Sequence, residues 1–266
     1  MDLGVLLPKV KQAALDSWGR LKNGADLEVQ VKGPHDFVTR VDLEISEYLC
    51  SVLPALLDDS QVVSEERKDA ASSLPYRWII DPIDGTNNLI YGLPFYAVSI
   101  GLVHEMQSLL GVVYLPGTGE LFSAARNHGA LAENLPAKTV RAVRVNSAAA
   151  LDVSIVMAET DPYFDRKKNP SMDLIRAVFQ KCLDLRITGS AAIDMSYIAS
   201  GRAMVHFCRH LSPWDYAGGA AILMEAGGLV SQWDGTPMPY EGRHTSLASS
   251  SGAIHEAMLE ILGRFL

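Results

Sequence analysis

The chain has 266 residues, of which 48% are hydrophobic and 20% are charged, a balance typical of a folded globular protein. The 23 basic and 31 acidic residues give a formal net charge of −8, and no basic stripe is present, so we expect no nucleic-acid partner. No segment reaches the ~20 continuous apolar residues of a membrane helix, and Asp2 stands where a leader would be basic, so we expect neither a leader nor a membrane partner. Three scattered cysteines, Cys50, Cys182 and Cys208, favour a reducing cytoplasmic location over a disulfide framework.

The first half opens with apolar residues at helical spacing, which predict a helix over residues 3–21 and another over 41–53. Between them, residues 27–31 alternate like a short strand. Residues 60–66 predict a strand that ends in acidic residues, and a loop follows at 66–75. Four β-type runs separated by turns then predict successive strands of one sheet at 76–80, 95–103, 108–116 and 119–126.

Residues 128–152 show no strong periodicity and mark the expected boundary between two halves. We therefore divide the chain into 1–140 and 141–266, with the active site between them. In the second half, strands are predicted at 153–159, 183–187, 202–208 and 229–233. Helices are predicted at 171–182, 190–201, 214–228 and 252–266. The alternation of strand and helix indicates crossover connections and a layered sheet.

The segment WIIDPIDGTNN begins as a buried strand and ends in two aspartates. Pro82 fixes its own φ and biases Asp81 toward extended geometry, while the following Gly-Thr turns the chain. The carboxylates of Asp81 and Asp84 and the Ile83 carbonyl can thereby meet in one pocket, and these are the oxygen ligands that Mg²⁺ prefers. Thr86 can cap a following helix, whose free N–H groups bind phosphate. The alternative is an Asx-turn that closes a strand.

Two further acidic signals accompany this segment. Glu65 ends a predicted strand, a favourable position for a metal ligand, although a Glu-Glu pair is often a solvated surface pair. Asp215 lies at the head of a helix of small residues, where it can bind a metal or only cap the helix. With Asp81 and Asp84, these acids could hold two or three cations, which is how a metal phosphatase activates water.

The segments WIIDPIDGTNN and WDYAGGAAILMEAGG, together with KGPHDFVTRVD, SEE, AVSIGLV, GVVYLP and ITGSAAIDMSYIASGRA, resemble the inositol monophosphatase family over nearly the whole chain. This family belongs to the Mg²⁺-dependent, lithium-sensitive phosphatases, whose other members include fructose-1,6-bisphosphatase and nucleotide 3′-phosphatases. The resemblance implies a mixed α/β fold, a five-layer αβαβα sandwich, and a homodimer. The apolar runs at 95–103 and 109–115 could supply part of a dimer interface.

The resemblance also implies a site for two to three Mg²⁺ ions. Glu65, Asp81 and the Ile83 carbonyl would hold the first ion, and Asp81, Asp84 and Asp215 would hold the second. A third, weaker ion would share Glu65, and lithium would compete at the second site.

Around those metals, the resemblance assigns Thr86 and Asp42, with Glu65, to orienting the attacking water. The substrate would be bound by residues on both halves of the chain, namely Asp84, Gly85, Thr86, Gly189, Ser190 and Ala191. Lys32 and Asp36 would lie on a mobile loop that closes near the metals.

One position departs from the family pattern. Members that prefer inositol phosphate carry a glutamate seven residues before the Trp-Asp aspartate, and here that position is Cys208, a poor substitute for a charged acceptor. We expect a metal-dependent phosphomonoesterase that hydrolyses a small polyol or sugar phosphate, with inositol monophosphate as the first candidate substrate. Fructose-1,6-bisphosphate, NADP and 3′-phosphoadenosine phosphate are the alternatives.

Three other interpretations stay open. The motif HFCRH places His206, Cys208 and His210 on one face of a strand, either as a zinc site or as a strand edge that lines the substrate pocket. Asp81 could act as a covalent nucleophile, although two residues separate the aspartates where aspartyl-nucleophile phosphatases have one. The chain could also be a non-catalytic binding protein on this scaffold, but such a protein should have lost a metal ligand or Thr86.

Overall fold

The computed structural model describes residues 1–21, 27–67, 74–161 and 170–266. Its helices are α1 (Leu3–Gly19), α2 (Arg40–Val52), α3 (Thr86–Ile90), α4 (Ser171–Phe179), α5 (Ala191–Ala199), α6 (Pro213–Glu225) and α7 (Gly252–Leu262). The first nine strands are β1 (Gln30–Gly33), β2 (Asp36–Val38), β3 (Ser60–Ser64), β4 (Tyr76–Asp84), β5 (Ala97–His104), β6 (Gln107–Leu115), β7 (Glu120–Ala125), β8 (Gly129–Asn134) and β9 (Thr139–Val143). The remaining strands are β10 (Ile155–Ala158), β11 (Asp184–Arg186), β12 (Val205–Leu211), β13 (Leu229–Ser231) and β14 (His244–Ser249).

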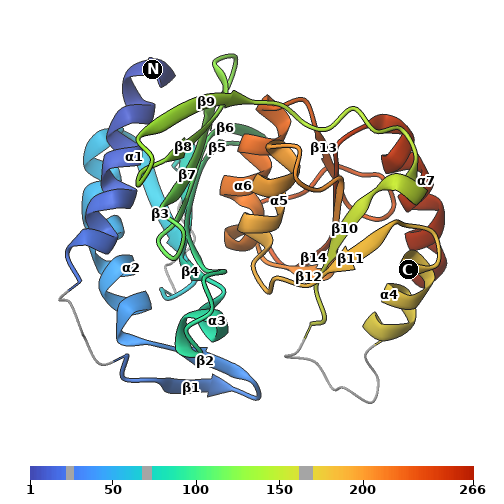
Figure 1. Cartoon of the computed structure of the whole chain (residues 1–266). Coiled ribbons are helices and arrows are strands. Elements are labelled where there is room, and N and C mark those ends of the chain that lie inside the picture. The colour runs from blue at the N-terminus through green and yellow to red at the C-terminus, as the bar shows by residue number, and fades with distance from the viewer. Residues whose placement is uncertain (22–26, 68–73, 162–169) are drawn as a thin grey trace.

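These elements stack as five layers in the order αβαβα, which confirms the predicted fold class (Figure 1). Helices α1 and α2 cover one face of a seven-stranded sheet with strand order β3-β4-β5-β6-β7-β8-β9. Helices α5 and α6 lie between this sheet and a five-stranded sheet of order β11-β10-β12-β14-β13. Helices α4 and α7 form the layer beyond the second sheet, and β1 and β2 form a separate hairpin.

Both faces of the first sheet are buried, because alternate residues of each strand face different layers. On β4, Trp78 and Ile80 pack with α1 and α2, whereas Ile79 packs with the middle helices. The runs at 95–103 and 109–115 form β5 and β6 in the interior of this sheet, almost entirely buried. The suggestion that these runs supply a dimer interface is therefore wrong, since their side chains already form the core.

Small residues let α6 approach this sheet closely. A Cβ atom placed on Gly111 of β6 would lie 2.2 Å from the carbonyl oxygen of Gly218 on α6. A Cβ atom on Gly218 would in turn lie 2.6 Å from the Ser99 hydroxyl of β5. The small-residue pattern of α6 thus fixes its distance from the sheet, and with it the position of the helix N-terminus beside the end of β4.

The structure corrects the prediction for residues 128–152 and contains one strand that sequence reasoning missed. Residues 128–152, expected to lack regular structure, contain β8 and β9, so the 140/141 division falls inside β9. Strand β9 is an edge strand with four of its five residues exposed, and it therefore has no hydrophobic periodicity to detect. Strand β14 was missed because its sequence, HTSLAS, is rich in polar residues. Most of the predicted 66–75 loop lies outside the described residues.

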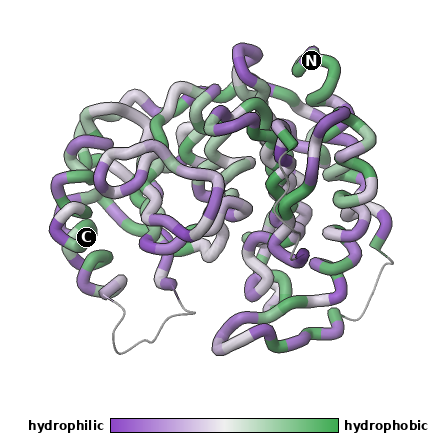
Figure 2. The backbone as a smooth tube through the Cα atoms, turned by 180° about the vertical axis from the view of Figure 1, so that it is seen from behind, coloured by the Kyte–Doolittle hydropathy of each residue, from purple (hydrophilic) through white to green (hydrophobic). Residues whose placement is uncertain are grey.

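The two ends of the chain lie in the outer helical layers on opposite sides of the molecule, which is also clear from behind (Figure 2). Across the described part of the chain, no helix combines the length and the apolar character needed to span a bilayer.

Candidate active site

The end of β4 carries two of the predicted metal ligands. A bulge between Asp81 and Asp84 interrupts the pairing with β5, so the two side chains do not follow the simple alternation of a strand. The Ile83 N–H donates to Asp81 Oδ1 at 3.0 Å. Gly85 follows with φ +94°, and a Cβ atom there would lie 2.6 Å from the Phe95 carbonyl oxygen. Only glycine fits this turn, which delivers the chain into α3.

Asp84 also connects the two halves of the chain. Its Oδ2 accepts hydrogen bonds from the Ser190 hydroxyl and the Ala192 N–H, both at 2.7 Å. Nearby, the Asn88 side-chain amide donates to the carbonyl oxygen of Thr188 at 2.8 Å. These bonds hold the end of β4 against the N-terminus of α5. Both bonds to Asp84 use Oδ2, so Oδ1 is the oxygen that remains for the predicted metal.

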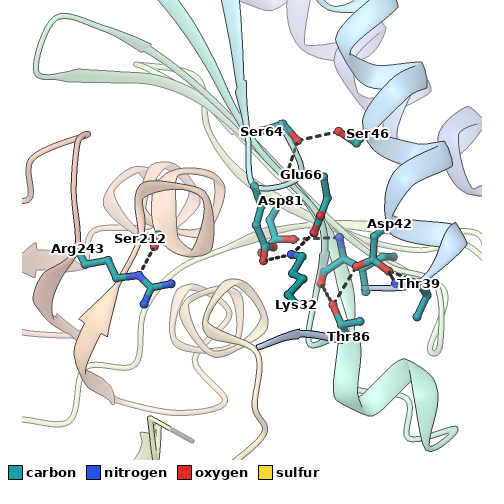
Figure 3. Close-up of polar contacts among 12 residues, drawn as sticks. Lys32, Thr39, Asp42, Ser46, Ser64, Glu66, Asp81, Thr86, Ser212 and Arg243 are labelled. Atoms are coloured by element: carbon teal, nitrogen blue, oxygen red, sulfur yellow. Dashed lines mark hydrogen bonds and ion pairs between the residues drawn. The ribbon is translucent and has the colours of Figure 1, made fainter. Parts of the chain in front are cut away.

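Glu65 directly follows β3 and faces the same region. The Lys32 ammonium lies 3.0 Å from Glu65 Oε1 and 2.5 Å from Glu66 Oε1 (Figure 3). Burial alone would lower the pKa of Lys32, but attraction to Glu65 and the bonds to both glutamates outweigh burial and raise it. The predicted loop around Lys32 and Asp36 is a hairpin here, with Lys32 on β1 and Asp36 on β2.

The position of Asp215 is compatible with both of its sequence interpretations. It is the third residue of α6, and its Oδ2 accepts from the Ser212 N–H at 2.6 Å in a capping box. Its carboxylate also lines the cavity that contains Asp81 and Asp84. The cap therefore fixes the orientation of a carboxylate that lines the cavity, and capping does not exclude the predicted role as a metal ligand.

Thr86 and Asp42 form a hydrogen-bonded pair beside these acids (Figure 3). The Thr86 hydroxyl lies 2.9 Å from Asp42 Oδ1 and 3.0 Å from the Ile83 carbonyl oxygen. On its other side, Asp42 Oδ2 accepts from the Thr39 N–H at 2.9 Å in the capping box of α2. Burial raises the pKa of Asp42, although the bonds from Thr39 and Thr86 oppose this shift.

The predicted ligands line one cavity of about 90 Å³. We call Glu65, Asp81, Asp84 and Asp215 the cavity cluster. Sequence reasoning missed Arg243, which also lines this cavity and donates from Nε to the Ser212 hydroxyl at 3.2 Å (Figure 3). A larger cavity of about 310 Å³ lies between β6, β7 and α6, but it contains none of the predicted ligands.

The cavity cluster is electrostatically unfavourable without cations. Burial, followed by repulsion from Glu65 and Asp84, raises the pKa of Asp81 well above its usual value. Burial and repulsion from Asp84 and Glu65 do the same for Asp215, and burial raises the pKa of Asp84 to about 7. A cluster of buried carboxylate oxygens with mutually raised pKa values fits hard divalent cations, which would remove both the repulsion and the cost of burial. The residues present therefore fit the predicted Mg²⁺ ions.

A second cavity of about 90 Å³ adjoins the first and shares Asp84, Gly85, His210 and Asp215 with it. It brings together three predicted substrate positions, Gly189, Ala191 and Cys208. Ser190, another predicted substrate position, does not line this cavity. It is buried with its hydroxyl donating to Asp84, so it supports the cavity wall from behind.

Sequence reasoning also missed Glu159 and Asp161, which line the second cavity. The Cys208 thiol lies 3.3 Å from Asp161 Oδ1, and the Ser171 hydroxyl donates to Asp161 Oδ2 at 3.1 Å. The signal was available, since MAETD ends a strand in acidic residues just as VVSEE does. A carboxylate therefore stands next to the position where the family glutamate is absent.

The three candidate ligands of the HFCRH motif do not all face the same cavity. Cys208 and His210 line the second cavity, as the strand-edge interpretation predicted. His206 is buried and is not among the residues of that lining. The three side chains therefore do not form one zinc site.

Comparisons with known proteins agree with this geometry. The family model described as "Inositol monophosphatase family" matches residues 5–264. A Vibrio cholerae protein named Nus factor SuhB is 35% identical over 217 residues, 81% of this chain and 79% of that protein. The Mesorhizobium japonicum inositol-1-monophosphatase is 33% identical over 244 residues, 88% of each chain. A solved structure of inositol monophosphatase from Anabaena (Nostoc) has a TM-score of 0.80 at 28% identity and covers 99% of this chain and 97% of that one.

Proposed function

We propose that this chain, which belongs to the inositol monophosphatase family of phosphatases, is a Mg²⁺-dependent phosphomonoesterase that hydrolyses inositol monophosphate or a closely similar polyol phosphate. The observation that carries the proposal is the convergence of Glu65, Asp81, Asp84 and Asp215 on one cavity, beside the hydrogen-bonded pair of Thr86 and Asp42. These acids come from both halves of the chain. Such a convergence is expected of a metal-assisted hydrolase rather than of a binding protein that has lost its chemistry.

The cavity cluster and the Ile83 carbonyl would hold two to three Mg²⁺ ions. When bound, Mg²⁺ supplies charge neutralisation for the phosphoryl oxygens and lowers the pKa of water. The N–H groups of Gly85 and Thr86, at the start of α3, would bind the phosphate. Arg243 would add a positive charge at the rim of the same cavity.

Thr86 and Asp42 would orient the attacking water. The Thr86 hydroxyl has one hydrogen, which it donates to the ionised Asp42 carboxylate, with 2.9 Å between Thr86 Oγ1 and Asp42 Oδ1. Thr86 Oγ1 can then only accept a hydrogen from water, and this directs a lone pair of the water toward phosphorus. Direct attack by water makes Asp81 a ligand and not a covalent nucleophile.

The second cavity would hold the leaving group. Asp84, Glu159 and Asp161 offer carboxylate acceptors for ring hydroxyls there. Asp161 lies beside Cys208 and would replace the family glutamate, so recognition of inositol does not require an acid at position 208.

The proposal extends to inhibition and assembly. Lithium would inhibit by competing at the second metal site, and the enzyme would be a cytoplasmic homodimer. Sedimentation at micromolar concentration tests the dimer, and only a monomer near 28.9 kDa would contradict it.

A phosphate-release assay tests the activity. Inositol monophosphate, fructose-1,6-bisphosphate, NADP and 3′-phosphoadenosine phosphate are compared, each with Mg²⁺, with Mg²⁺ plus lithium, and with EDTA. We expect inositol monophosphate to be preferred, and we expect lithium or EDTA to abolish turnover. Activity that persists in EDTA would refute the metal mechanism, whereas preference for another ester would refute only the substrate.

A further inference from the structure

A second group of ionisable side chains lies behind the substrate cavity. Glu159, Asp194 and His206 each offer one ligand atom, and these atoms all lie within 4.8 Å of one another. The three residues, which we call the inner cluster, come from the end of β10, from α5 and from β12. None of them belongs to the cavity cluster or to the roles proposed above for water and phosphate.

Asp194 and His206 of the inner cluster are buried, Glu159 is half-buried, and each of the three residues has at least one buried side-chain atom without a hydrogen-bond partner. The side chains of Asp194 and His206 have no exposed surface. Within the described part of the chain, no hydrogen bond reaches Glu159 Oε1, Asp194 Oδ2 or either ring nitrogen of His206. A buried polar atom without a partner is unfavourable, and here each of three neighbouring residues offers one ligand atom to the same small region, which calls for a ligand.

Protonation alone does not satisfy these atoms. Burial lowers the pKa of His206 to about 3, so the ring is neutral. Burial, followed by repulsion from nearby acids, raises the pKa of Glu159. Burial also raises the pKa of Asp194, against the bond from Thr188. Even with both acids protonated, His206 Nε2 lies 3.8 Å from Asp194 Oδ2, too far for a hydrogen bond.

A single dication would satisfy the cluster. Two carboxylates and a neutral imidazole balance a charge of +2, so the complex is neutral in a buried site. The mixed nitrogen and oxygen ligands suit Zn²⁺, which accepts few ligands at about 2.0–2.2 Å. Mg²⁺ is disfavoured, because it requires about six ligands that are nearly all oxygen and usually keeps several waters. Glu159 also lines the second cavity, which gives an ion a route of entry.

We propose that Glu159, Asp194 and His206 form a separate metal site that binds Zn²⁺, or a first-row transition ion of similar preference, behind the substrate cavity. Binding would draw the ligand atoms from within 4.8 Å to the roughly 3.3 Å spacing of a tetrahedral zinc site. The ion would fix the ends of β10 and β12 against α5. It would thereby hold Glu159, Asp161 and Cys208 in position around the leaving group.

Zinc retention tests the proposal. The full-length protein is stripped with a chelator, given equimolar Zn²⁺ and dialysed against millimolar Mg²⁺, and bound zinc is measured by mass spectrometry. We expect the wild type to retain about one zinc per chain. Glu159→Gln and Asp194→Asn preserve side-chain size and should weaken zinc binding by at least about tenfold. Asp161→Asn, a neighbouring carboxylate outside the inner cluster, should retain zinc, as should Asp84→Asn.

Cobalt gives a second readout. Co²⁺ in place of Zn²⁺ should give the visible absorption of a low-coordinate site, and His206→Phe should abolish that absorption. Because His206 is buried, the melting temperature of each variant is measured first, and Glu159→Gln decides the question if His206→Phe does not fold. Three results would overturn the proposal: no zinc retained by the wild type, zinc retained equally by Glu159→Gln and Asp194→Asn, or zinc lost from Asp84→Asn alone.

Discussion

The cavity cluster and the inner cluster are both acidic, and each combines buried with half-buried side chains, but they differ in how their oxygens are held. In the cavity cluster, Asp81, Asp84 and Asp215 each accept a hydrogen bond at one oxygen, and each lines a cavity. In the inner cluster, Asp194 and His206 are closed off and lack partners on the atoms that face one another. Carboxylates that hydrogen bonds hold in one orientation at an open cavity suit metal ions that exchange with solvent and contact the substrate. A closed mixed-ligand site suits an ion that stays.

The largest expected difference between the clusters is in turnover. Asp84→Asn removes a formal charge from the proposed Mg²⁺ site and should lower kcat by at least about a hundredfold, comparable to losing one major electrostatic stabiliser. Asp194→Asn should lower kcat by less than about tenfold, because Asp194 does not line either cavity. Steady-state phosphate release at saturating Mg²⁺ measures both, with exposed Asp58→Asn as the matched control. Equal losses in the two variants would contradict the division of roles.

Thr86 tests the water-orienting pair of the open site. Thr86→Val keeps the shape but removes the hydroxyl that joins Asp42, and kcat should fall about a hundredfold. Thr86→Ser keeps the hydroxyl and should stay within about tenfold of the wild type. If valine and serine behave alike, the hydroxyl does not position the water.

The acids of the cavity cluster should also make the stability of the fold depend on pH and on Mg²⁺. Because burial raises the pKa of Asp84 from 3.8 to about 7, its protonated form is favoured in the folded state. This stabilisation is complete below the unfolded pKa and is lost as pH rises through about 7. The melting temperature of Mg²⁺-free protein should therefore fall by at least about 3 °C between pH 5 and pH 8, and Mg²⁺ should restore it most at pH 8. Asp84→Asn should flatten this profile, and an unchanged slope would show that other groups cause it.

The smallest expected effect is the change in unfolding free energy caused by substitutions at Cys208, which lines the second cavity with residues of both clusters. Its thiol lies 3.3 Å from Asp161 Oδ1, so Cys208→Glu would place a second acid against Asp161 and destabilise the fold. Adding Asp161→Asn to Cys208→Glu should remove this repulsion. In a double-mutant cycle, the unfolding free energy of the double variant should exceed the value expected from the two single variants by about 1–2 kcal/mol. The double variant should also preserve the preference for inositol monophosphate over glycerol phosphate. Additive free energies would show that the two positions do not interact.

The sequence predicted the cavity cluster because much of it lies in one short motif. Asp81, Ile83 and Asp84 lie within four consecutive residues, and a proline and a glycine restrict the backbone around them. Glu65 and Asp215 were found because each lies at the end of a predicted element. The five-layer fold class followed from the family resemblance, whereas the apolar strands and small-residue helices by themselves indicated only a layered sheet with crossover connections.

The inner cluster was not predictable in the same way. Glu159, Asp194 and His206 lie on three separate elements, and only the packing of α5 between the sheets brings them together. The HFCRH motif pointed to His206 but paired it with the wrong neighbours, because spacing along one strand does not show what faces it. Strands β9 and β14 were missed for a related reason, since their sequences carry little hydrophobic signal.

The hydrogen bonds from Ser190 and Ala192 to Asp84 have a consequence for how the enzyme matures. They join positions 106 and 108 residues apart in the chain, and because closing so long a loop is entropically costly, we expect them to form only after the first sheet has docked on the middle helices. A chain that has folded only its first sheet has Asp81 and Asp84 but neither the Asp215 carboxylate nor the groups that orient Asp84. Nascent or truncated chains would therefore be unable to assemble the metal site, and hydrolysis would begin only when synthesis and folding of the whole protein are complete.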